Sequence, residues 1–383
     1  MYQSRLTVLL FQVLIVVASA KSQSILSPTG YNRIGTEYWA SGGAGIAERG
    51  VGTTAFENPA LISFISPTVT LEFGWRPETR LDDAPYDKTF LLPSYASIGI
   101  PLVSGMIELG YILPYKDHYD GGSGMFPYDG SPNSPLKLVE FNFTGIIQTA
   151  FVAISHSFQE NTSVGIAAGL DFVRSNDNGF NQQEAKGTRM QFSVGGVTRL
   201  FEIASVGFAA HVSTDRYLHY TIRSAFDGHI YSAAAIASWG SLPSYPAKSP
   251  PGAEIGTAVK IAQWLTLLGS VEYQNWNTSG NYMIDRLQYH AGAVASFLPN
   301  ISFRAGWFTM VSPYPLGRYY DNQYFLTGGV SWKAFESLNV TIAYQTSALL
   351  TREVLFIRRP SNEIYSQDSF SQQVLSAGVS YSL

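Results

Sequence analysis

The sequence predicts an all-β fold: a transmembrane antiparallel β-barrel of about fourteen strands with an N-terminal plug segment. From about residue 66 to the end, apolar residues alternate with polar or small ones at period two, which is typical of strands. The joins between these strands alternate in length, short then long, as periplasmic turns and extracellular loops do in outer-membrane barrels. Charged residues make up only 14% of the 383 residues, against roughly 25% in soluble domains, while aromatic residues also reach 14%.

The first twenty residues predict a signal peptide. Residues 1–5 are weakly basic, residues 6–17 form an apolar run, and Ala18, Ser19 and Ala20 make a small-residue cleavage pattern. A signal anchor retained in the membrane is the alternative, but this run is too short to span a bilayer comfortably. We therefore expect export, with Lys21 as the first mature residue, and exclude residues 1–20 from the fold.

Residues 21–65, which we call the hatch, lack strand alternation. They contain a glycine-rich run at residues 41–45 and an Asn-Pro pair at Asn58 and Pro59. The glycine spacing is not that of a dinucleotide-binding loop and no strand precedes it, so a phosphate site is disfavoured. Irregular backbone is tolerated at membrane depth only where protein or water surrounds it. A lumen enclosed by about fourteen strands is too wide for side chains alone to fill, so we expect the hatch to lie inside it.

Residues 66–383 are expected to form the barrel. The predicted strands lie near residues 67–76, 90–101, 105–115, 145–158, 162–175, 187–199, 203–214, 252–261, 264–276, 283–297, 300–311, 323–333, 337–347 and 372–383. Long loops are expected near residues 77–89, 116–144, 176–186, 215–251, 277–282, 312–322 and 348–371. A β-sandwich also alternates, but it has no reason to sort its joins by length in this way.

Strand parity predicts which side chains meet lipid. In the first strand Val69 and Leu71 share one parity and Thr70 and Glu72 the other, and the same segregation recurs in later strands. If the apolar parity faces lipid, the charged residues of the strands face the lumen, where a membrane barrel tolerates them. These residues are Glu72, Glu108, Asp171, Arg189, Glu272, Arg286 and Arg304. We expect them mainly to form a salt-bridge lattice, with a direct role in ligand binding as the alternative.

Composition and motifs argue against several other functions. The chain has no cysteine, and its six histidines show no HExxH or paired metal-ligand spacing; a GxSxG nucleophile motif is also absent. We therefore expect no enzyme activity, no metal and no cofactor. A net charge of −4 gives no electrostatic reason to expect nucleic acid.

The hatch carries a resemblance to a known family. Residues 40–60 combine a Gly-Gly-Ala-Gly run with the motif Asn58-Pro59-Ala60, and they resemble the N-terminal hatch of the FadL family of outer-membrane long-chain fatty acid transporters. Residues 92–101 and 111–119 resemble the second and third strands of that family. The family's motif is usually followed by glycine, whereas Leu61 follows here, and the broader superfamily includes PorV-like barrels that serve type IX secretion.

The resemblance implies a multi-pass protein of the outer membrane that takes up hydrophobic, fatty acid-like compounds. By that resemblance, long loops capture the ligand, the hatch gates its route, and it leaves sideways where a bent strand breaks the wall. Pro114 could produce such a bend, because proline removes a ladder donor. The implied hatch and gating residues are Phe56, Asn58, Pro59 and Ala60. The candidate ligand-binding residues are Tyr217, Tyr220, Phe226, Trp239 and Arg304.

Each of these roles has an alternative. The aromatic loops could instead cap the barrel by packing on one another, and Pro114 could be a plain irregularity of an edge. A PorV-like barrel serving protein secretion or surface attachment, with secretion-system partners, and a general porin stay open as functions. The other expected partners are the lipid of the outer membrane and the barrel-assembly machinery, whose C-terminal signal Val379, Tyr381 and Leu383 resemble. In that signal an aromatic residue is usual at the last position, where this chain has Leu383.

Overall fold

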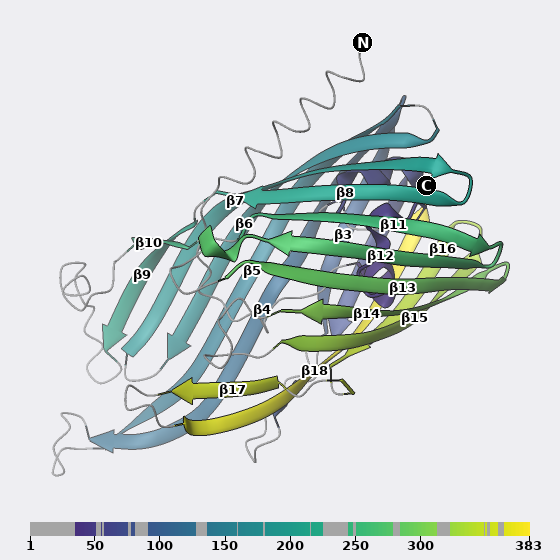
Figure 1. The fold of residues 1–383 in the computed structure, drawn as a ribbon. Coiled ribbons are helices and arrows are strands. Elements are labelled where there is room, and N and C mark those ends of the chain that lie inside the picture. Colours follow the sequence, from purple (N-terminus) through teal and green to yellow (C-terminus); the bar gives the residue numbers. More distant parts are fainter. Residues whose placement is uncertain are drawn as a thin grey trace.

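A computed structural model shows a closed β-barrel with part of the hatch in its lumen (Figure 1). The structure describes residues 35–50, 55, 57–75, 78–80, 91–127, 136–158, 160–178, 181–214, 216–224, 244–247, 250–278, 284–311, 322–347, 349–350, 353–358 and 364–383. The signal peptide predicted at residues 1–20, and Phe56 of the hatch, lie outside the described residues.

The described part of the chain contains eighteen strands in one antiparallel sheet. They are β1 (Thr68–Trp75), β2 (Glu78–Arg80), β3 (Leu91–Leu102), β4 (Gly105–Pro127), β5 (Leu136–Phe158), β6 (Thr162–Asn178), β7 (Asn181–Phe201), β8 (Ala204–Ser213), β9 (Arg216–Ser224), β10 (Ser244–Ala247), β11 (Gly252–Ala262), β12 (Leu265–Gln274), β13 (Arg286–Leu298), β14 (Ile301–Met310), β15 (Gln323–Phe335), β16 (Leu338–Thr346), β17 (Glu353–Arg358) and β18 (Ile364–Ser382).

Fourteen of these strands close the ring, which confirms the predicted fold class. The short strands β2, β9, β10 and β17 continue β1, β8, β11 and β16 beyond a break, and they pair with the same neighbours or with each other. The remaining strands pair in chain order, and β1 closes the ring against β18, from Thr68 opposite Ser382 to Trp75 opposite Leu375. Among the described residues, closure gives each of the fourteen strands of the ring two neighbours over at least part of its length, so most of their backbone groups are bonded within the barrel.

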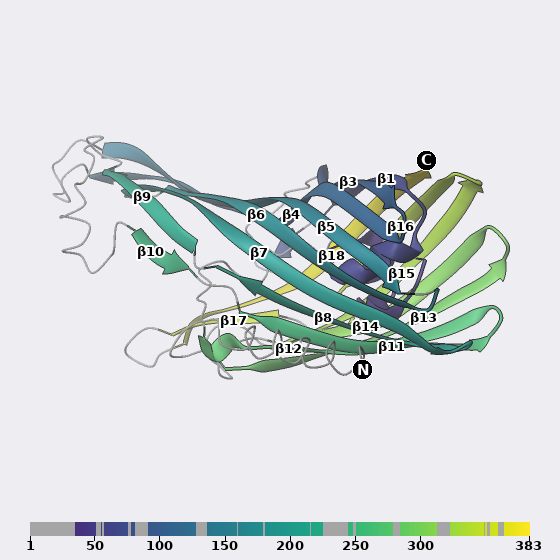
Figure 2. The same ribbon diagram turned by 90° about the horizontal axis from the view of Figure 1, so that it is seen from above.

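The loop predictions were wrong on one side of the barrel. Residues 116–127 and 136–144, expected in a loop, extend β4 and β5, and the loop expected at residues 176–186 consists mostly of β6 and β7. Four further segments of expected loop form β2, β9, β10 and β17, and the last strand begins at Ile364 rather than near residue 372. The four strands β4 to β7, with β9 paired along the upper part of β7, therefore extend well past the shorter strands β12 to β16 at the end opposite the tight turns (Figure 2).

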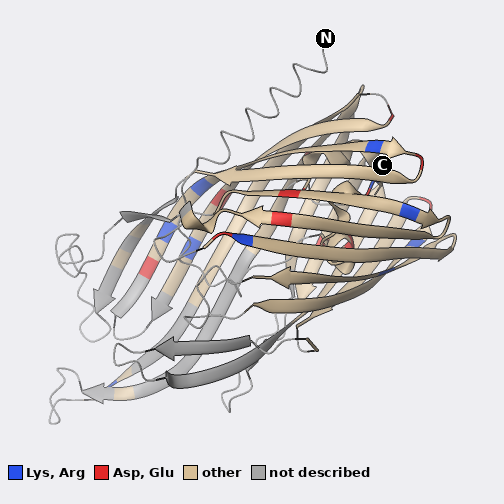
Figure 3. Cartoon of the chain, in the orientation of Figure 1, with Lys and Arg blue, Asp and Glu red and all other residues tan. Residues whose placement is uncertain are grey.

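The two faces of the wall differ as the parity predicts. Val69 is 41% exposed on the outer face, while the neighbouring Thr70 is 6% exposed. Large apolar residues such as Ile166, Ile255 and Ile342 are exposed on the outside, and the charges Glu72, Glu108, Asp171, Arg189 and Arg304 are buried on the inside. Figure 3 shows how few charges the wall carries. An apolar outer face and a polar lumen are the arrangement that a lipid bilayer requires of a barrel.

The described helices are all short and belong to the hatch or to a loop. They are α2 (Thr36–Ala40), η2 (Gly45–Ala47), η3 (Pro59–Phe64) and η4 (Trp276–Thr278), of which the last three are 3-10 helices. In the part of the chain that the structure describes, no helix has the length and apolar character needed to cross a membrane.

Candidate functional site: the hatch and the lumen around it

The helices α2, η2 and η3 of the hatch lie against the inner face of the barrel. Figure 2 shows them inside the ring, at the end where the tight turns and the C-terminus lie. The helix α2 contacts β14, β15, β16 and β18, η2 contacts β8, β11 and β12, and η3 contacts β4, β5, β6 and β7. The hatch thus touches strands on all sides of the ring.

Glycines in the wall allow this close approach. A Cβ atom placed on any of seven inward-facing glycines would come closer than 3.0 Å to a hatch atom. At Gly195 it would overlap the side-chain oxygen of Asn58, and at Gly292 the carbonyl oxygen of Ser41. Since real Cβ atoms essentially never come so close, only glycine fits at these positions without a shift of the hatch. The seven glycines are Gly165, Gly195, Gly207, Gly256, Gly292, Gly306 and Gly329.

The first anchor of the hatch is Glu72 on β1. Its carboxylate accepts hydrogen bonds from the backbone N–H of Gly35 at 3.0 Å and of Thr36 at 2.9 and 3.0 Å. These are orphan donors at the start of α2, which lacks a side-chain cap of its own. A carboxylate at the N-terminal end of a helix also meets the favourable end of its dipole. Glu72 therefore ties the start of α2 in the hatch to the strand at the closing seam.

The second anchor is Arg304 on β14. Its two terminal nitrogens bond separate hatch carboxylates, Nη1 to Glu48 at 2.9 Å and Nη2 to Glu37 at 2.8 Å. Burial raises the pKa of the Glu48 carboxyl, and the guanidinium of Arg304 opposes that rise. Removing one member of such a buried pair leaves an uncompensated charge, which is strongly destabilising. The structure therefore gives Arg304 a definite role in holding the hatch; the predicted role in ligand binding stays a prediction.

The third anchor is Asn58, the first residue of the predicted gating motif. Its side-chain oxygen accepts from the Ala60 N–H at 3.1 Å and caps η3. Its side-chain nitrogen donates to the carbonyl of Ile46 at 2.8 Å and to that of Gly196 on β7 at 3.3 Å. Pro59 occupies the first position of η3, where its missing N–H costs nothing. One fully buried side chain thus joins two hatch helices to the wall.

Hydroxyl and imidazole groups of the wall bond the hatch backbone at further points. Ser205 donates to the carbonyl of Ala47 at 2.7 Å, and Thr327 donates to that of Ala40 at 3.0 Å. The Nδ1 atom of His290 lies 2.9 Å from the carbonyl oxygen of Gly42. Because these contacts satisfy backbone groups of irregular chain, the hatch is held by its backbone at least as much as by its side chains.

An aromatic cluster covers part of the hatch on the side of the long loops. Phe308 and Phe325 stack with ring centroids 4.6 Å apart, and the edge of Trp39 on α2 meets Phe308 at 5.0 Å. Met310 packs against this cluster. We call Trp39, Phe308, Phe325 and Met310 the aromatic shelf.

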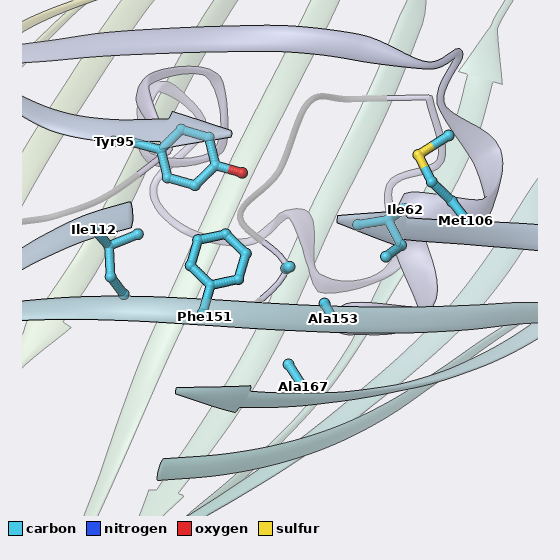
Figure 4. Packing of buried hydrophobic residues seen from close by; sticks show 8 residues of the cluster. Ile62, Tyr95, Met106, Ile112, Phe151, Ala153 and Ala167 are labelled. Atoms are coloured by element: carbon cyan, nitrogen blue, oxygen red, sulfur yellow. The ribbon is translucent and has the colours of Figure 1, made fainter. Parts of the chain in front are cut away.

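A second apolar cluster lies on the opposite wall (Figure 4). Tyr95 of β3 stacks with Phe151 of β5 at 6.1 Å, and Ile112 of β4 lies beside them. Ala55 and Ile62 of the hatch belong to the same cluster. The hydroxyl of Tyr95 donates to the buried carboxylate of Glu108. Hatch and wall thus share one apolar core at this place.

The barrel wall is interrupted next to this second cluster. Among the described residues, β3 and β4 pair from Leu102 and Gly105 as far as Tyr95 and Ile112, and no further. A register shift in β4 then leaves two residues, Leu113 and Pro114, out of the ladder with β5. Beyond that point β3 continues along β1 and β4 along β5. The structure thus places Pro114, singled out in the sequence, in a bulge at the point where two adjacent strands part.

Of the four candidate aromatic ligand residues, two lie in a described strand and two lie outside the described residues, so their role in ligand binding stays a prediction. Tyr217 and Tyr220, expected in a loop, belong to β9, where they pair with Pro246 and Ala185. Phe226 and Trp239 lie outside the described residues. No group of three or more His, Cys, Asp or Glu side chains among the described residues is arranged to hold a metal ion.

Comparison with known proteins identifies the fold. No protein-family model and no curated protein sequence matches this chain. Solved structures do match over almost the full length. The toluene transporter TodX of Pseudomonas putida superposes with a TM-score of 0.67 at 13% identity, over 93% of this chain and 99% of TodX. A FadL homologue of Pseudomonas aeruginosa gives a TM-score of 0.62 at 14% identity, over 95% and 100% of the two chains.

This chain has the FadL-type fold. The toluene transporter TbuX of Ralstonia pickettii agrees, with a TM-score of 0.63 at 12% identity over 91% of this chain and 98% of TbuX. The FadL resemblance seen in the residues around Asn58 is therefore confirmed at the level of fold. Within a FadL-type fold, hatch, shelf and interrupted wall together form the candidate site.

Several residues of this site were not anticipated from the sequence. Glu37 and Glu48 lie in a segment without periodicity, so nothing in the pattern indicated that both would meet Arg304. Two neutral residues, Gln323 and Gln345, lie on the inward parity of β15 and β16 and are each 1% exposed. Parity could have marked these two as lumen-facing, but the prediction considered only charged residues.

Proposed function

We propose that this protein is an outer-membrane channel through which hydrophobic compounds enter the cell. The observation that carries the proposal is a barrel of FadL-type fold whose lumen is obstructed by a hatch anchored on all sides, beside a wall with a break. A general porin needs an open aqueous lumen, which this arrangement does not favour. An apolar compound has little need of a water-filled route, since lipid lies just outside the wall.

The proposed route ends at the break between β3 and β4. A compound that reaches the cluster of Tyr95, Ile112 and Phe151 is surrounded by apolar side chains next to the place where the wall ladder stops. Leaving sideways into the bilayer spares it a passage through water, which is the unfavourable step for an apolar molecule. The hatch residues Ala55 and Ile62 line the same cluster, so movement of the hatch would change access to the exit.

The remaining expectations fit this proposal. The apolar outer face places the barrel in a membrane, and export across the inner membrane would depend on the predicted signal peptide. The structures matched here are described as toluene transporters or as a FadL homologue, which favours uptake over a PorV-like role in secretion. The barrel-assembly machinery is the partner that would insert the chain, reading its C-terminal strand.

Uptake by whole cells tests the proposal. Gram-negative cells that lack their own channels for hydrophobic compounds would be given this gene, and the entry of radiolabelled toluene and of radiolabelled oleate would be followed. We expect entry of at least one compound several times faster than in cells with the empty vector, and no gain in entry of a small sugar. Faster entry of the sugar together with an unobstructed single-channel conductance would instead identify a general porin and contradict the proposal.

A further inference from the structure

We propose that the β15–β16 wall beside the hatch binds the uncharged hydrogen-bonding group of an otherwise apolar compound. The inference rests on the proposed function and narrows its substrate class. The ligand would be a hydrophobic molecule with a neutral donor or acceptor, such as a phenol, an alcohol or a ketone, rather than an ionised carboxylate.

The first observation is a pair of buried amides without partners. Gln323 and Gln345 are each 1% exposed, and in both side chains the oxygen and the nitrogen lack a hydrogen-bond partner. Buried polar atoms are nearly always hydrogen-bonded, because an unpaired one has lost its water without replacement. An unpaired amide is therefore buried on each of two adjacent wall strands. This arrangement indicates that a bound ligand supplies the missing hydrogen-bond partner.

The second observation is the direction in which these amides point. Gln323, Phe325 and Thr327 alternate on one face of β15, and Thr327 bonds the hatch carbonyl of Ala40, which fixes that face as the lumen side. Gln345 is the cross-strand partner of Thr327 on β16. The two amides therefore lie on either side of Phe325 along the barrel axis. Gln323 lies two residues closer to the long loops than Phe325, and Gln345 lies at the level of the hatch.

The third observation is the buried apolar cluster between the amides, in which Phe308 is 0% and Phe325 1% exposed. Phe325 belongs to the aromatic shelf, which also includes Phe308, Trp39 and Met310, the cross-strand partner of Gln323. Ligand sites for small organic molecules combine such apolar walls with a few precisely placed polar groups. A ring or chain that enters this cluster and packs against the shelf would place a polar substituent within reach of one amide or the other.

The fourth observation concerns charge. The two arginines that are buried among the described residues are already engaged by carboxylates, Arg304 by Glu37 and Glu48 and Arg189 by Asp171. An ionised ligand near the shelf would have to leave water and meet neutral amides, which solvate a charge far less well than an arginine does. An uncharged hydroxyl or carbonyl needs only one neutral hydrogen bond. The wall therefore favours a neutral compound.

A matched set of three probes tests this substrate class. Toluene, 4-methylphenol and 4-methylbenzoate share one ring and one methyl group; at neutral pH the phenol is uncharged and the benzoate is ionised. Their equilibrium binding to the protein in lipid nanodiscs would be measured, with binding to empty nanodiscs subtracted. We expect 4-methylphenol to bind more tightly than 4-methylbenzoate.

The variants Gln323→Leu and Gln345→Leu connect the preference to the amides. At least one of them should weaken binding of 4-methylphenol by about threefold to tenfold and leave toluene within about twofold, since one neutral hydrogen bond is lost. Gln148→Leu is the matched control, because Gln148 is exposed and bonds Tyr111. Gln323→Met and Gln345→Met replace any leucine variant that fails to migrate as a folded, heat-modifiable band.

The outcomes separate this inference from the proposed function. If 4-methylbenzoate binds more tightly than 4-methylphenol, or if neither amide variant changes binding of 4-methylphenol, the substrate class is wrong while uptake of hydrophobic compounds stands. If none of the three probes binds and whole cells show no gain in uptake, the proposed function itself fails.

Discussion

At the scale of single residues, the site is organised by polar groups that tie irregular chain to regular strands. Glu72, Arg304 and Asn58 each bond two or more hatch groups. The hatch has little regular structure, and its helices are too short to be stable alone. Its conformation therefore depends on these contacts.

Asn58→Asp tests the most connected of these residues. The change keeps the oxygen that caps η3 but replaces the amide donor by a second acceptor, which then faces the carbonyls of Ile46 and Gly196. We expect a loss of about 1–3 kcal/mol in the stability of the seated hatch, seen as a lower temperature for loss of the folded band and as flickering conductance in planar bilayers. Asn300→Asp, at an exposed turn, is the control. Equal behaviour of the two variants would show that Asn58 does not hold the hatch.

Gly195→Ala tests the close approach of hatch and wall. The added methyl group would overlap the Asn58 side chain, so the hatch must shift, at a cost of about 1–3 kcal/mol. Gly269→Ala is the matched control, since the nearest atom to its new Cβ would be 3.9 Å away. Cysteine cross-linking of the hatch to the wall should be slower in the first variant than in the second. Equal rates would mean that the glycine is not needed for seating.

Sequence parity identified which charges face the lumen but not what they contact. Burial of Glu72, Glu108 and Arg304 agrees with the prediction. Arg189 and Asp171 form a salt bridge, as predicted. Glu72 instead accepts hydrogen bonds from backbone amides of the hatch, and Glu108 accepts one from a tyrosine hydroxyl. Parity depends on the strand alone, while the partners depend on the path of a segment without periodicity, and that path cannot be derived from local pattern.

At the scale of elements, β4 combines a regular lower half with a bulge and a long extension. Its lower half pairs with both neighbours up to Ile112, and past Pro114 its one partner among the described residues is β5. Proline fits this place because it cannot donate to a ladder, and a bulge redirects the strand.

Removing the bulge should close the proposed exit. Deleting Leu113 and replacing Pro114 by valine would restore the alternation of β4 and allow it to pair further with β3. We expect uptake of the hydrophobic tracer to fall by about tenfold or more, while the amount of folded barrel in the membrane stays the same. A single Pro114→Ala change, which retains the extra residue, is the comparison. Unchanged uptake in the deletion variant would rule out this gap as the exit.

The extensions of β4 to β7 explain why the loop predictions failed. Within the bilayer one face of a strand meets lipid, so apolar and polar residues segregate by parity. Beyond the bilayer both faces can be polar, and residues 116–123 accordingly consist of lysine, aspartate, histidine, tyrosine, glycine and serine with no apolar parity. The backbone continues as strand while the signal that revealed the lower part is absent.

At the scale of the whole molecule, ring and hatch have separable roles. The ring of fourteen strands closes without the hatch. In the described part of the chain β1 pairs with β3 and β18, and every other strand of the ring has two neighbours over at least part of its length. The number of strands in the ring was predictable from the sequence, because each strand carries its own alternation of apolar and polar residues. The position of the hatch inside was expected only from lumen size and from the family resemblance.

Deleting residues 35–65 should leave a barrel that still inserts into the membrane and that conducts ions through an open lumen. We expect the deletion variant to migrate as a heat-modifiable band and to show a single-channel conductance several times that of the intact protein, because the lumen loses its obstruction. Selective uptake of hydrophobic tracer should disappear as sugars begin to pass. If conductance does not change, the described hatch is not what blocks the lumen.

The seam between β1 and β18 has a consequence for the order in which the protein is assembled. The strands at that seam come from opposite ends of the barrel sequence, and the hatch is joined directly to β1 and bonded to it through Glu72. The hatch therefore travels with the strand that must meet the final strand, and the ring closes around it. We expect pairing of β1 with β18 to be the last event of biogenesis. The hatch would then be enclosed as the ring forms and would not enter a barrel that has already closed.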